Sequence, residues 1–242
     1  MLTRLPAFLV IFCLATVNAT AEVLPHSFAN IEECRIKHLH LDLDVDFDAR
    51  QLVGSAELML DRQPNCDSVT LDTNGLQIRT ISEAGKNTKR VLDYVLGDQR
   101  GVLGRGLTVQ LPPGVDKIRI EYATRPGAAA LQWLTPEQTT DKKQPFLFTQ
   151  SQAILARTWV PCQDTPAVRM TYSAKLRVPS ELLAVMSAAN PQVKNETGEY
   201  SFEMKQAIPS YLLALAVGDL QFVDVSERCG IYAEPSVVKK AA

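Results

Sequence analysis

Histidine is scarce in this sequence, and its scarcity excludes several kinds of catalytic site. The 242 residues contain three histidines, His26, His38 and His40, so none follows position 40. A zinc peptidase of the H-E-x-x-H type needs two histidines four residues apart on a helix and a carboxylate beside the attacking water. The sequence has no such motif. We therefore expect no catalytic residue and no metal ligand of that type in this chain.

Other catalytic signatures are also missing. The sequence has no G-x-S-x-G elbow, no P-loop and no G-x-G-x-x-G, which argues against an α/β serine hydrolase and against the common nucleotide-binding folds. Cys162 follows a proline and has no histidine near it in the sequence. A nucleophilic cysteine needs such a base, so we interpret Cys162 as a packed thiol.

Cysteine is sparse as well. Cys34, Cys66, Cys162 and Cys229 lie far apart and form no C-x-x-C, and the fifth cysteine is Cys13 near the N-terminus. Four distant cysteines are too few for a disulfide-rich scaffold. One pair can bridge in an oxidising compartment, but the sequence alone does not say which.

Neither charge sign dominates. Lysine and arginine total 25 against 27 acidic residues, a net charge of −2, and no basic face is evident that would attract a phosphate backbone. We therefore expect no nucleic-acid partner. Hydrophobic residues make up 46% and charged residues 21%, which is an ordinary globular balance that argues against extensive disorder.

Long hydrophobic runs are limited to the N-terminus. The run from Leu5 to Val17 follows Arg4 and precedes an A-x-A pattern at Ala19 and Ala21. This order is typical of a secretory signal peptide, and the run is shorter than the ~20 residues that span a bilayer. We expect cleavage after Ala21, export to the periplasm or extracellular space, and no membrane span. An N-terminal membrane anchor is the alternative.

Period-two alternation is the main signal that is present. Residues 39–47 read LHLDLDVDF, which places apolar side chains on one face and aspartates on the other. Such alternation is typical of a strand with one buried face. Residues 127–145 are irregular and polar, so we expect a surface loop there, and a short helical turn is possible near residues 180–183. Short apolar or alternating segments separated by turn residues predict an all-β fold with antiparallel sheets; they are residues 56–60, 69–71, 76–81, 107–111, 117–122, 172–178, 183–187, 200–204, 211–217, 221–225 and 231–233.

Polar residues on the first strand raise two metal-site alternatives. By strict alternation Cys34, His38 and His40 share one face, opposite the leucines, so we expect them to be solvent-facing, with a metal site on the two histidines as the minor alternative. The aspartates at positions 42–48 would lie ~7 Å apart, which is loose for one calcium. We interpret them as a solvated strand face that discourages edge pairing. The sequon at residues 195–197 matters only in a eukaryotic host.

The densest group of motifs lies in the middle of the chain. It contains QSQAI at residues 150–154, Arg157, PCQDTP at residues 161–166 and TYSA at residues 171–174. Other matching segments are ALQWLTP at residues 130–136, PSYLLALAVG at 209–218 and YAEP at 232–235. In this order the motifs resemble the M1 family of zinc aminopeptidases, in the branch that contains leukotriene A4 hydrolase and its bacterial relatives. The resemblance runs from about residue 30 to the C-terminus.

The resemblance implies a specific architecture. It implies an all-β, saddle-shaped, antiparallel multi-sheet β-sandwich over residues 22–230, after the signal peptide of residues 1–21. Residues 231–242 would begin the linker into a catalytic domain. In the family that domain carries the zinc ion, the H-E-x-x-H motif and the G-x-M-E-N loop, and this sequence contains neither motif. We therefore expect a fragment or stand-alone domain that is inactive alone and holds no cofactor of its own.

The resemblance also implies substrate-binding residues. Gln152 matches a family glutamine that contacts the N-terminal end of a peptide substrate, with Ala153 beside it and Gln150 as a weaker candidate. Ser151 stands where the family often has cysteine. The expected partners are the N-terminus of a peptide substrate and an M1 catalytic domain, in cis or in trans. Two alternatives stay open: Gln152 only ties its loop together, or the chain is a non-catalytic binding or interaction module.

Overall fold

The computed structural model describes residues 26–85 and 90–242, so the expected signal peptide lies outside the described residues. The largest of its four sheets has six strands in the order β12-β10-β1-β2-β7-β4. Its neighbours are antiparallel except β1 and β10, which run parallel. The bounds are β1 Cys34–Asp46, β2 Gln51–Arg62, β4 Gln77–Glu83, β7 Lys117–Ala123, β10 Met170–Arg177 and β12 Glu199–Ile208.

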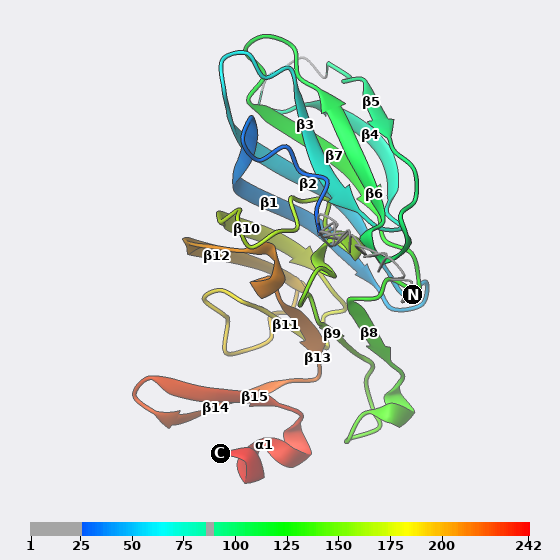
Figure 1. Ribbon diagram of the computed structural model, residues 1–242. Coiled ribbons are helices and arrows are strands. Elements are labelled where there is room, and N and C mark those ends of the chain that lie inside the picture. The colour runs from blue at the N-terminus through cyan, green and yellow to red at the C-terminus, as the bar shows by residue number, and fades with distance from the viewer. Residues whose placement is uncertain (1–25, 86–89) are drawn as a thin grey trace, which may run out of the picture.

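A three-stranded sheet packs against one part of the six-stranded sheet (Figure 1). It consists of β3 Ser68–Thr73, β5 Tyr94–Leu96 and β6 Arg105–Gln110, and is followed along the chain by β7. Apolar side chains of β3 and β6, such as Leu71 and Leu107, are fully buried in the same core cluster as Leu58 and Ile120 of the large sheet. The two sheets therefore form a sandwich over one hydrophobic core.

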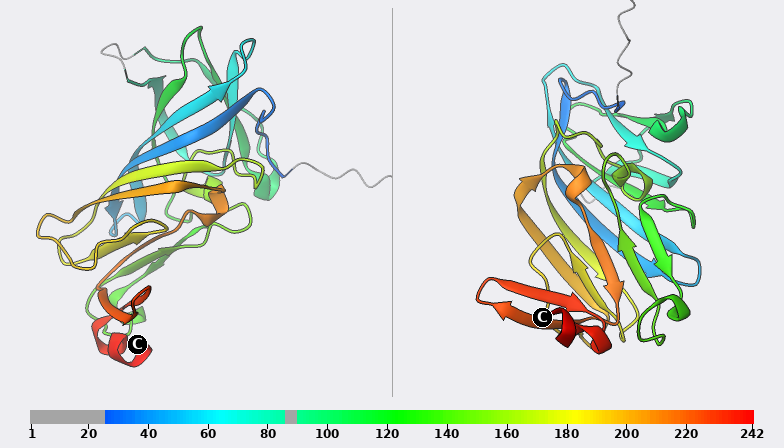
Figure 2. Two further views of the ribbon diagram at one scale, coloured as in Figure 1. Left: turned by 90° about the vertical axis from the view of Figure 1, so that its left-hand side faces the viewer. Right: turned by 60° about the horizontal axis from the view of Figure 1, so that its bottom comes forward.

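A four-stranded sheet and a terminal hairpin form the other end of the molecule (Figures 1 and 2). The sheet runs β11-β13-β9-β8, with β8 Leu131–Leu134, β9 Phe146–Thr149, β11 Leu183–Met186 and β13 Leu215–Gly218. The hairpin of β14 Gln221–Ser226 and β15 Cys229–Ala233 leads into α1 Pro235–Ala241. Short 3-10 turns are η1 Gly101–Leu103, η2 Pro136–Gln138, η3 Ala156–Thr158 and η4 Ser210–Leu212.

The expected all-β, multi-sheet fold is confirmed, and the alternation on β1 is confirmed from Leu39 onward. The expected shared face of Cys34, His38 and His40 is wrong. A register shift between Ile36 and His38 marks a β-bulge, which turns Cys34 and Ile36 into the core while both histidines stay half-buried. One extra residue in a strand reverses the inside–outside order beyond it.

The two histidines face β10. The Nδ1 atoms of His38 and His40 lie 2.8 Å from Thr171 Oγ1 and Ser173 Oγ, respectively, and His38 Nε2 lies 3.1 Å from the same Ser173 oxygen. Parallel pairing places His38 beside Thr171 and His40 beside Ser173. Hydroxyl groups of β10 thus engage both ring nitrogens of His38 and Nδ1 of His40.

The aspartate stripe has a different role from the one expected. β1 is a central strand, flanked by β10 and β2, so its aspartates guard no edge. Instead Arg177 of β10 pairs with Asp42, at 2.7 Å from Nη1 to Oδ1, and with Asp44. Asp46 accepts a hydrogen bond from the backbone N–H of Ala49 in the β1–β2 turn. The strand that supplies the arginine comes from far along the sequence, so local alternation did not indicate it.

The expected surface loop at residues 127–145 is also wrong in part. It contains β8 and η2, and Ala128, Ala130 and Leu131 are buried. Strands of three or four residues, such as β5, β8 and β9, are too short for alternation to reveal. Residues 180–182 form a turn and no helix, and Leu183 already begins β11. Across the described residues, none of the helices has the length and apolar character that crossing a membrane requires.

Candidate functional site

The segment from β9 to η3 carries the residues expected to bind substrate. Gln150, Gln152 and Ala153 are exposed, whereas Ser151 between them is buried. A backbone hydrogen bond of 2.9 Å from Leu155 N to Ser151 O closes the turn. The peptide bond between Gln152 and Ala153 is cis. The turn thus presents Gln152 and Ala153 to solvent and anchors itself through Ser151.

A pocket of about 310 Å³ opens beside this turn. Two of its six lining residues, Gln152 and Ala153, were expected from the sequence to bind substrate, and the other four were not. Gln150 lies outside the pocket. No hydrogen bond within the described residues engages the Gln152 side chain, so its amide is available both to donate and to accept. The lining residues are His26, Gln152, Ala153, Ile154, Pro166 and Tyr211.

The rim of the pocket is assembled from three distant parts of the chain. His26 Nε2 lies 2.8 Å from Thr165 Oγ1, which ties the start of the described chain to the PCQDTP segment. Tyr211 belongs to η4, just before β13. No local pattern marks either residue as a pocket residue. Of the four missed residues, Ile154, Pro166 and Tyr211 fall inside the motif segments at residues 150–154, 161–166 and 209–218, and this was the signal that could have found them.

Ser151 connects the Gln152 turn to the Tyr211 turn. Its hydroxyl donates to the carbonyl oxygen of Leu213 at 2.7 Å and accepts from Trp159 Nε1 at 3.1 Å. Trp159 is fully buried, so the indole N–H has no access to water. This bond pair fixes one side of the pocket relative to the other.

Arg157 is the central support beneath the turn. Its side chain is fully buried and its Nε donates to Oδ2 of Asp164 at 3.0 Å. The remaining donors reach the carbonyl oxygens of Leu103 and His26, both at 2.8 Å, and of Asp164 at 3.0 Å. Nη1 also lies 3.6 Å from Oδ1 of Asp72. The planar guanidinium thereby joins the start of the described chain, η1, β3 and the PCQDTP segment.

The two carboxylates around Arg157 are satisfied by further donors. Asp164 Oδ1 accepts from Ser210 Oγ at 2.6 Å. Asp72 accepts from Ser27 Oγ at 2.6 Å, and from the backbone N–H groups of Phe28 at 2.7 Å and Asp164 at 2.8 Å. Buried charges are tolerated when they are paired and fully hydrogen-bonded. Ser210 immediately precedes Tyr211, so the network also holds the aromatic wall of the pocket.

Gln163 joins the PCQDTP segment to the large sheet. Its side chain is 1% exposed, its Oε1 accepts from the N–H of Ile36 at 3.0 Å, and its Nε2 donates to the carbonyl oxygen of Cys34 at 2.8 Å. These two backbone groups lie at the edge of the β1 bulge. Because β10 pairs with β1 only from His38 onward, the amide supplies hydrogen bonds to the part of β1 that β10 does not reach.

Cys162 is a packed thiol, as expected. It is fully buried, and burial raises its pKa well above the ordinary value, with Asp164 and Asp72 raising it further. Its carbonyl oxygen accepts from the N–H of Asp72 at 2.7 Å. A thiol held protonated in this way is not a nucleophile.

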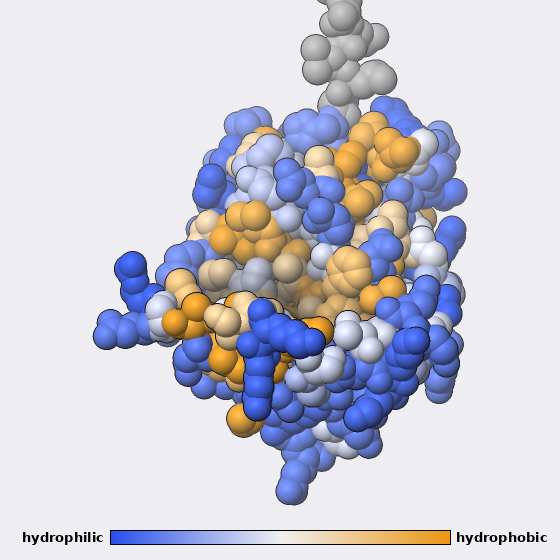
Figure 3. Space-filling model, turned by 90° about the horizontal axis from the view of Figure 1, so that it is seen from below, coloured by the Kyte–Doolittle hydropathy of each residue, from blue (hydrophilic) through white to orange (hydrophobic). Residues whose placement is uncertain are grey.

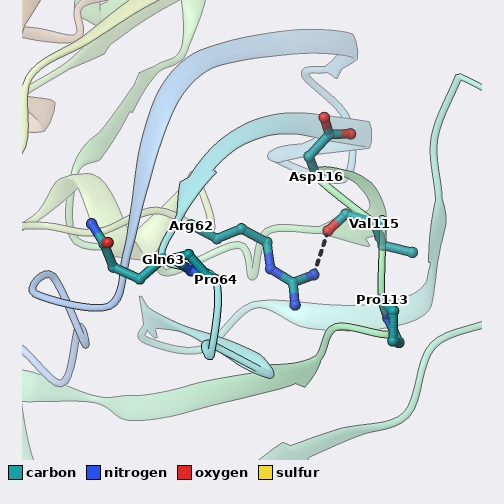
Figure 4. A pocket seen from close by; sticks show the side chains of 7 residues that line it. Arg62, Gln63, Pro64, Pro113, Val115 and Asp116 are labelled. Atoms are coloured by element: carbon teal, nitrogen blue, oxygen red, sulfur yellow. Dashed lines mark hydrogen bonds between the residues drawn. The ribbon is translucent and has the colours of Figure 1, made fainter.

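A second pocket lies elsewhere. It has a volume of about 380 Å³ and is lined by Arg62 at the end of β2, by the following turn with Pro64, and by the turn before β7 with Pro113 and Asp116 (Figure 4). None of the residues expected to bind substrate lies there. Within the described residues, no group of three or more His, Cys, Asp and Glu side chains is arranged to hold a metal ion.

Comparisons with known proteins cover most of the chain. Residues 35–212 match the family described as Peptidase M1 N-terminal domain. Leukotriene A-4 hydrolase of Xenopus laevis is 38% identical over 226 residues, which is 89% of this chain and 36% of that protein. Leucine aminopeptidase 2 of Yarrowia lipolytica is 36% identical over 241 residues, which is 93% of this chain and 36% of that protein.

Solved structures agree with these sequence matches. Native yeast LTA4 hydrolase superposes with a TM-score of 0.80 at 30% identity, covering 89% of this chain and 34% of that one. Yeast LTA4 hydrolase in complex with bestatin gives a TM-score of 0.81 at 30% identity, covering 93% and 35%. The chain therefore spans little more than a third of the length of the relatives it matches.

Proposed function

The chain belongs to the peptidase M1 family and matches its N-terminal domain, and from this membership we propose its function. In this proposal the chain forms the substrate-side wall of an exported zinc aminopeptidase. Residues 22–230 are the β domain, and residues 231–242 begin the linker to a catalytic domain. That domain supplies the zinc ion and the acid–base groups that remove N-terminal residues from peptides.

The Gln152 pocket is the observation that carries this proposal. It places an unengaged amide and a small side chain, Ala153, on an apolar wall with Ile154 and Tyr211. The amide oxygen can accept from a substrate ammonium and the amide N–H can donate to a substrate carbonyl. The buried Arg157 and Ser151 contacts hold the turn in place before substrate arrives, which lowers the entropy lost on binding.

Zinc does not fit the described residues of this chain. His38 and His40 are engaged by Thr171 and Ser173, and no third suitable ligand accompanies them in the parts described. Structural and catalytic zinc sites need three or four converging protein ligands. In this proposal the zinc ligands belong to the catalytic domain.

An apolar face supports docking of that domain. Figure 3 views the molecule from the end that carries α1 and the β14–β15 hairpin, and hydrophobic side chains surround a hollow there. Phe148 of β9 is 39% exposed and Leu212 of η4 is 48% exposed. A contiguous apolar surface such as the one around this hollow is typical of an interaction site.

A chimaera tests the proposal. The chain would replace the matching N-terminal part of a leucine aminopeptidase 2, and hydrolysis of a leucyl-anilide would be measured. We expect the isolated chain to be inactive and free of stoichiometric zinc, and the chimaera to be active. Gln152→Ala should lower kcat/KM of the chimaera roughly 10–100-fold, because one hydrogen bond to a charged group is lost.

Gln77→Ala is the matched control, because Gln77 is an exposed glutamine on β4 of the large sheet and should leave kcat/KM unchanged. Circular dichroism would establish that each variant is folded. Chelator-sensitive hydrolysis by the isolated chain would contradict the proposal, and so would a folded, active chimaera that is indifferent to Gln152→Ala.

A non-catalytic interaction module is the second candidate, favoured by the same exposed Phe148 and Leu212. Size-exclusion chromatography at two protein concentrations separates the two functions. Concentration-dependent self-association that Phe148→Ser abolishes, together with an inactive chimaera, would favour the module.

A further inference from the structure

Two buried cysteines lie together at the open end of the β1–β2 hairpin. Cys34 begins β1 and pairs with Arg62 at the end of β2. The chain then turns back: Gln63 N donates to Glu33 O at 2.8 Å and Cys66 N donates to Gln63 O at 3.0 Å. Cys34 and Cys66 are 1% and 6% exposed. Both residues belong to the same buried core cluster, and Cys66 is among the groups that raise the pKa of the Cys34 thiol.

The backbones on both sides of the thiol pair are held by separate contacts. Cys34 N donates to Asn30 O at 3.0 Å, and Cys34 O accepts from Gln163. Cys66 Sγ donates to Ser68 O at 2.9 Å. Each cysteine therefore keeps its place without help from the other.

Arg62 fixes the turn that carries Cys66. Its guanidinium donates to the carbonyl oxygens of Val115 at 2.9 Å and Pro112 at 3.0 Å, and it also contacts the carbonyl oxygen of Cys66. Figure 4 shows this side chain reaching across the pocket to Val115. The turn is thus tied to the β6–β7 connection, and its Cys66 is buried in the same core cluster as Cys34.

We infer that Cys34 and Cys66 form a disulfide bond when the protein folds in contact with a disulfide oxidant such as glutathione disulfide. A thiolate of one cysteine attacks the oxidant, forms a mixed disulfide and releases one glutathione thiolate, which takes up a proton. The second cysteine, as thiolate, then attacks its partner's sulfur. The Sγ–Sγ bond forms, the mixed disulfide breaks and a second glutathione leaves, so two thiols are oxidised and one disulfide is reduced to two thiols.

The bond forms before the core closes. Burial is the main cause that raises the pKa of Cys34 to about 12, and Cys66 raises it further, against a smaller lowering by Arg62. A protonated thiol does not attack a disulfide, so the folded, reduced protein oxidises slowly. Of the other cysteines in the described residues, Cys162 is buried beside Asp72 and Asp164 and Cys229 is exposed on β15.

Thiol mapping of the unmodified protein tests the inference. The denatured, reduced protein would be refolded with oxidised and reduced glutathione, quenched in acid, denatured, alkylated with N-ethylmaleimide and digested without reductant. We expect mass spectrometry to show a peptide linked through Cys34 and Cys66, and alkylated Cys162 and Cys229. Alkylation of both Cys34 and Cys66, or a different linked pair, would overturn the inference.

Thermal unfolding provides an independent measurement. Closing the loop between residues 34 and 66 restricts the unfolded chain, so dithiothreitol should lower the Tm of the refolded protein by roughly 5–15 °C. Cys66→Ser should abolish this reductant-dependent shift, and Cys229→Ser should keep it. A Tm of the unmodified protein that does not respond to dithiothreitol would contradict the inference. Mapping needs no variant, so it stands even where Cys66→Ser fails to fold.

Discussion

Arg157 Nε lies 3.0 Å from Oδ2 of Asp164, and the two side chains are 0% and 1% exposed. The pair is local in sequence, but its surroundings are not: Asp72, Ser210 and the carbonyl oxygen of His26 complete it from three other segments. A single buried cation therefore joins the Gln152 turn to most of the elements that shape the pocket.

Replacing this arginine should be strongly destabilising. In Arg157→Met the apolar volume is largely kept, but Asp164 and Asp72 remain buried without their cation. Removing one partner of a buried ion pair typically costs about 3–5 kcal/mol. Urea denaturation followed by circular dichroism should show that loss of unfolding free energy.

Arg35→Met is the control, because Arg35 pairs with Glu32 at a solvent-exposed position. This substitution should change stability by less than about 1 kcal/mol. Equal losses in the two variants would refute the role given to Arg157.

Replacing Gln163 should destabilise the fold more than replacing an exposed glutamine. Gln163→Ala leaves the N–H of Ile36 and the carbonyl oxygen of Cys34 without partners in the core. Each buried, unsatisfied polar group costs about 1–3 kcal/mol, so we expect a loss of roughly 2–4 kcal/mol in urea denaturation. Gln77→Ala, at an exposed position of β4, should be neutral within about 0.5 kcal/mol. A neutral Gln163→Ala would mean that these two backbone groups do not depend on this amide.

Two substitutions of Ser151, to alanine and to cysteine, test how much its hydrogen bonds between the two pocket turns contribute to stability. Ser151→Ala orphans Trp159 Nε1 and the carbonyl oxygen of Leu213, for an expected loss of about 1–3 kcal/mol. Ser151→Cys should lose less, because a thiol is a weak donor and acceptor at the same place. Thermal unfolding of both variants checks this order, and a larger loss for cysteine than for alanine would contradict it.

The lowered pKa of His38 predicts that the stability of the fold depends on pH. Burial is the main cause that lowers the pKa of His38 below its ordinary 6.5; His40 and Lys117 lower it further, and Glu203 acts in the opposite direction. As the pH falls through 6.5, the unfolded chain binds the proton before the folded one does. Unfolding is then favoured, so stability decreases on acidification and is regained above 6.5.

The measurement compares Tm at pH values from 7.5 to 5 with that of His38→Gln, which can still reach Thr171 and Ser173. The unmodified protein should lose more Tm across this window than the variant, whose other titrating groups are the same. Parallel curves would show that His38 contributes nothing to the acid sensitivity.

Some features of the site could be predicted and others could not. The lack of a nearby base in the sequence predicted a packed Cys162, and this residue is buried. Gln152 and Ala153 were named only through the resemblance to the M1 family, and their role stays a prediction. His26 and Tyr211 were missed, because a pocket wall is set by which distant turns meet and no local pattern records that.

The sequence by itself determined the strand from Leu39 onward and the all-β class, because alternation of apolar and polar residues is a local property of the chain. Tertiary structure alone decided that β10 pairs with β1 in parallel, that a bulge turns Cys34 inward, and that Arg177 neutralises Asp42 and Asp44. Each of these depends on contacts between residues more than a hundred positions apart or on one inserted residue in a ladder. Such contacts form only when the whole core closes, and their energies belong to the assembled sheets rather than to any segment.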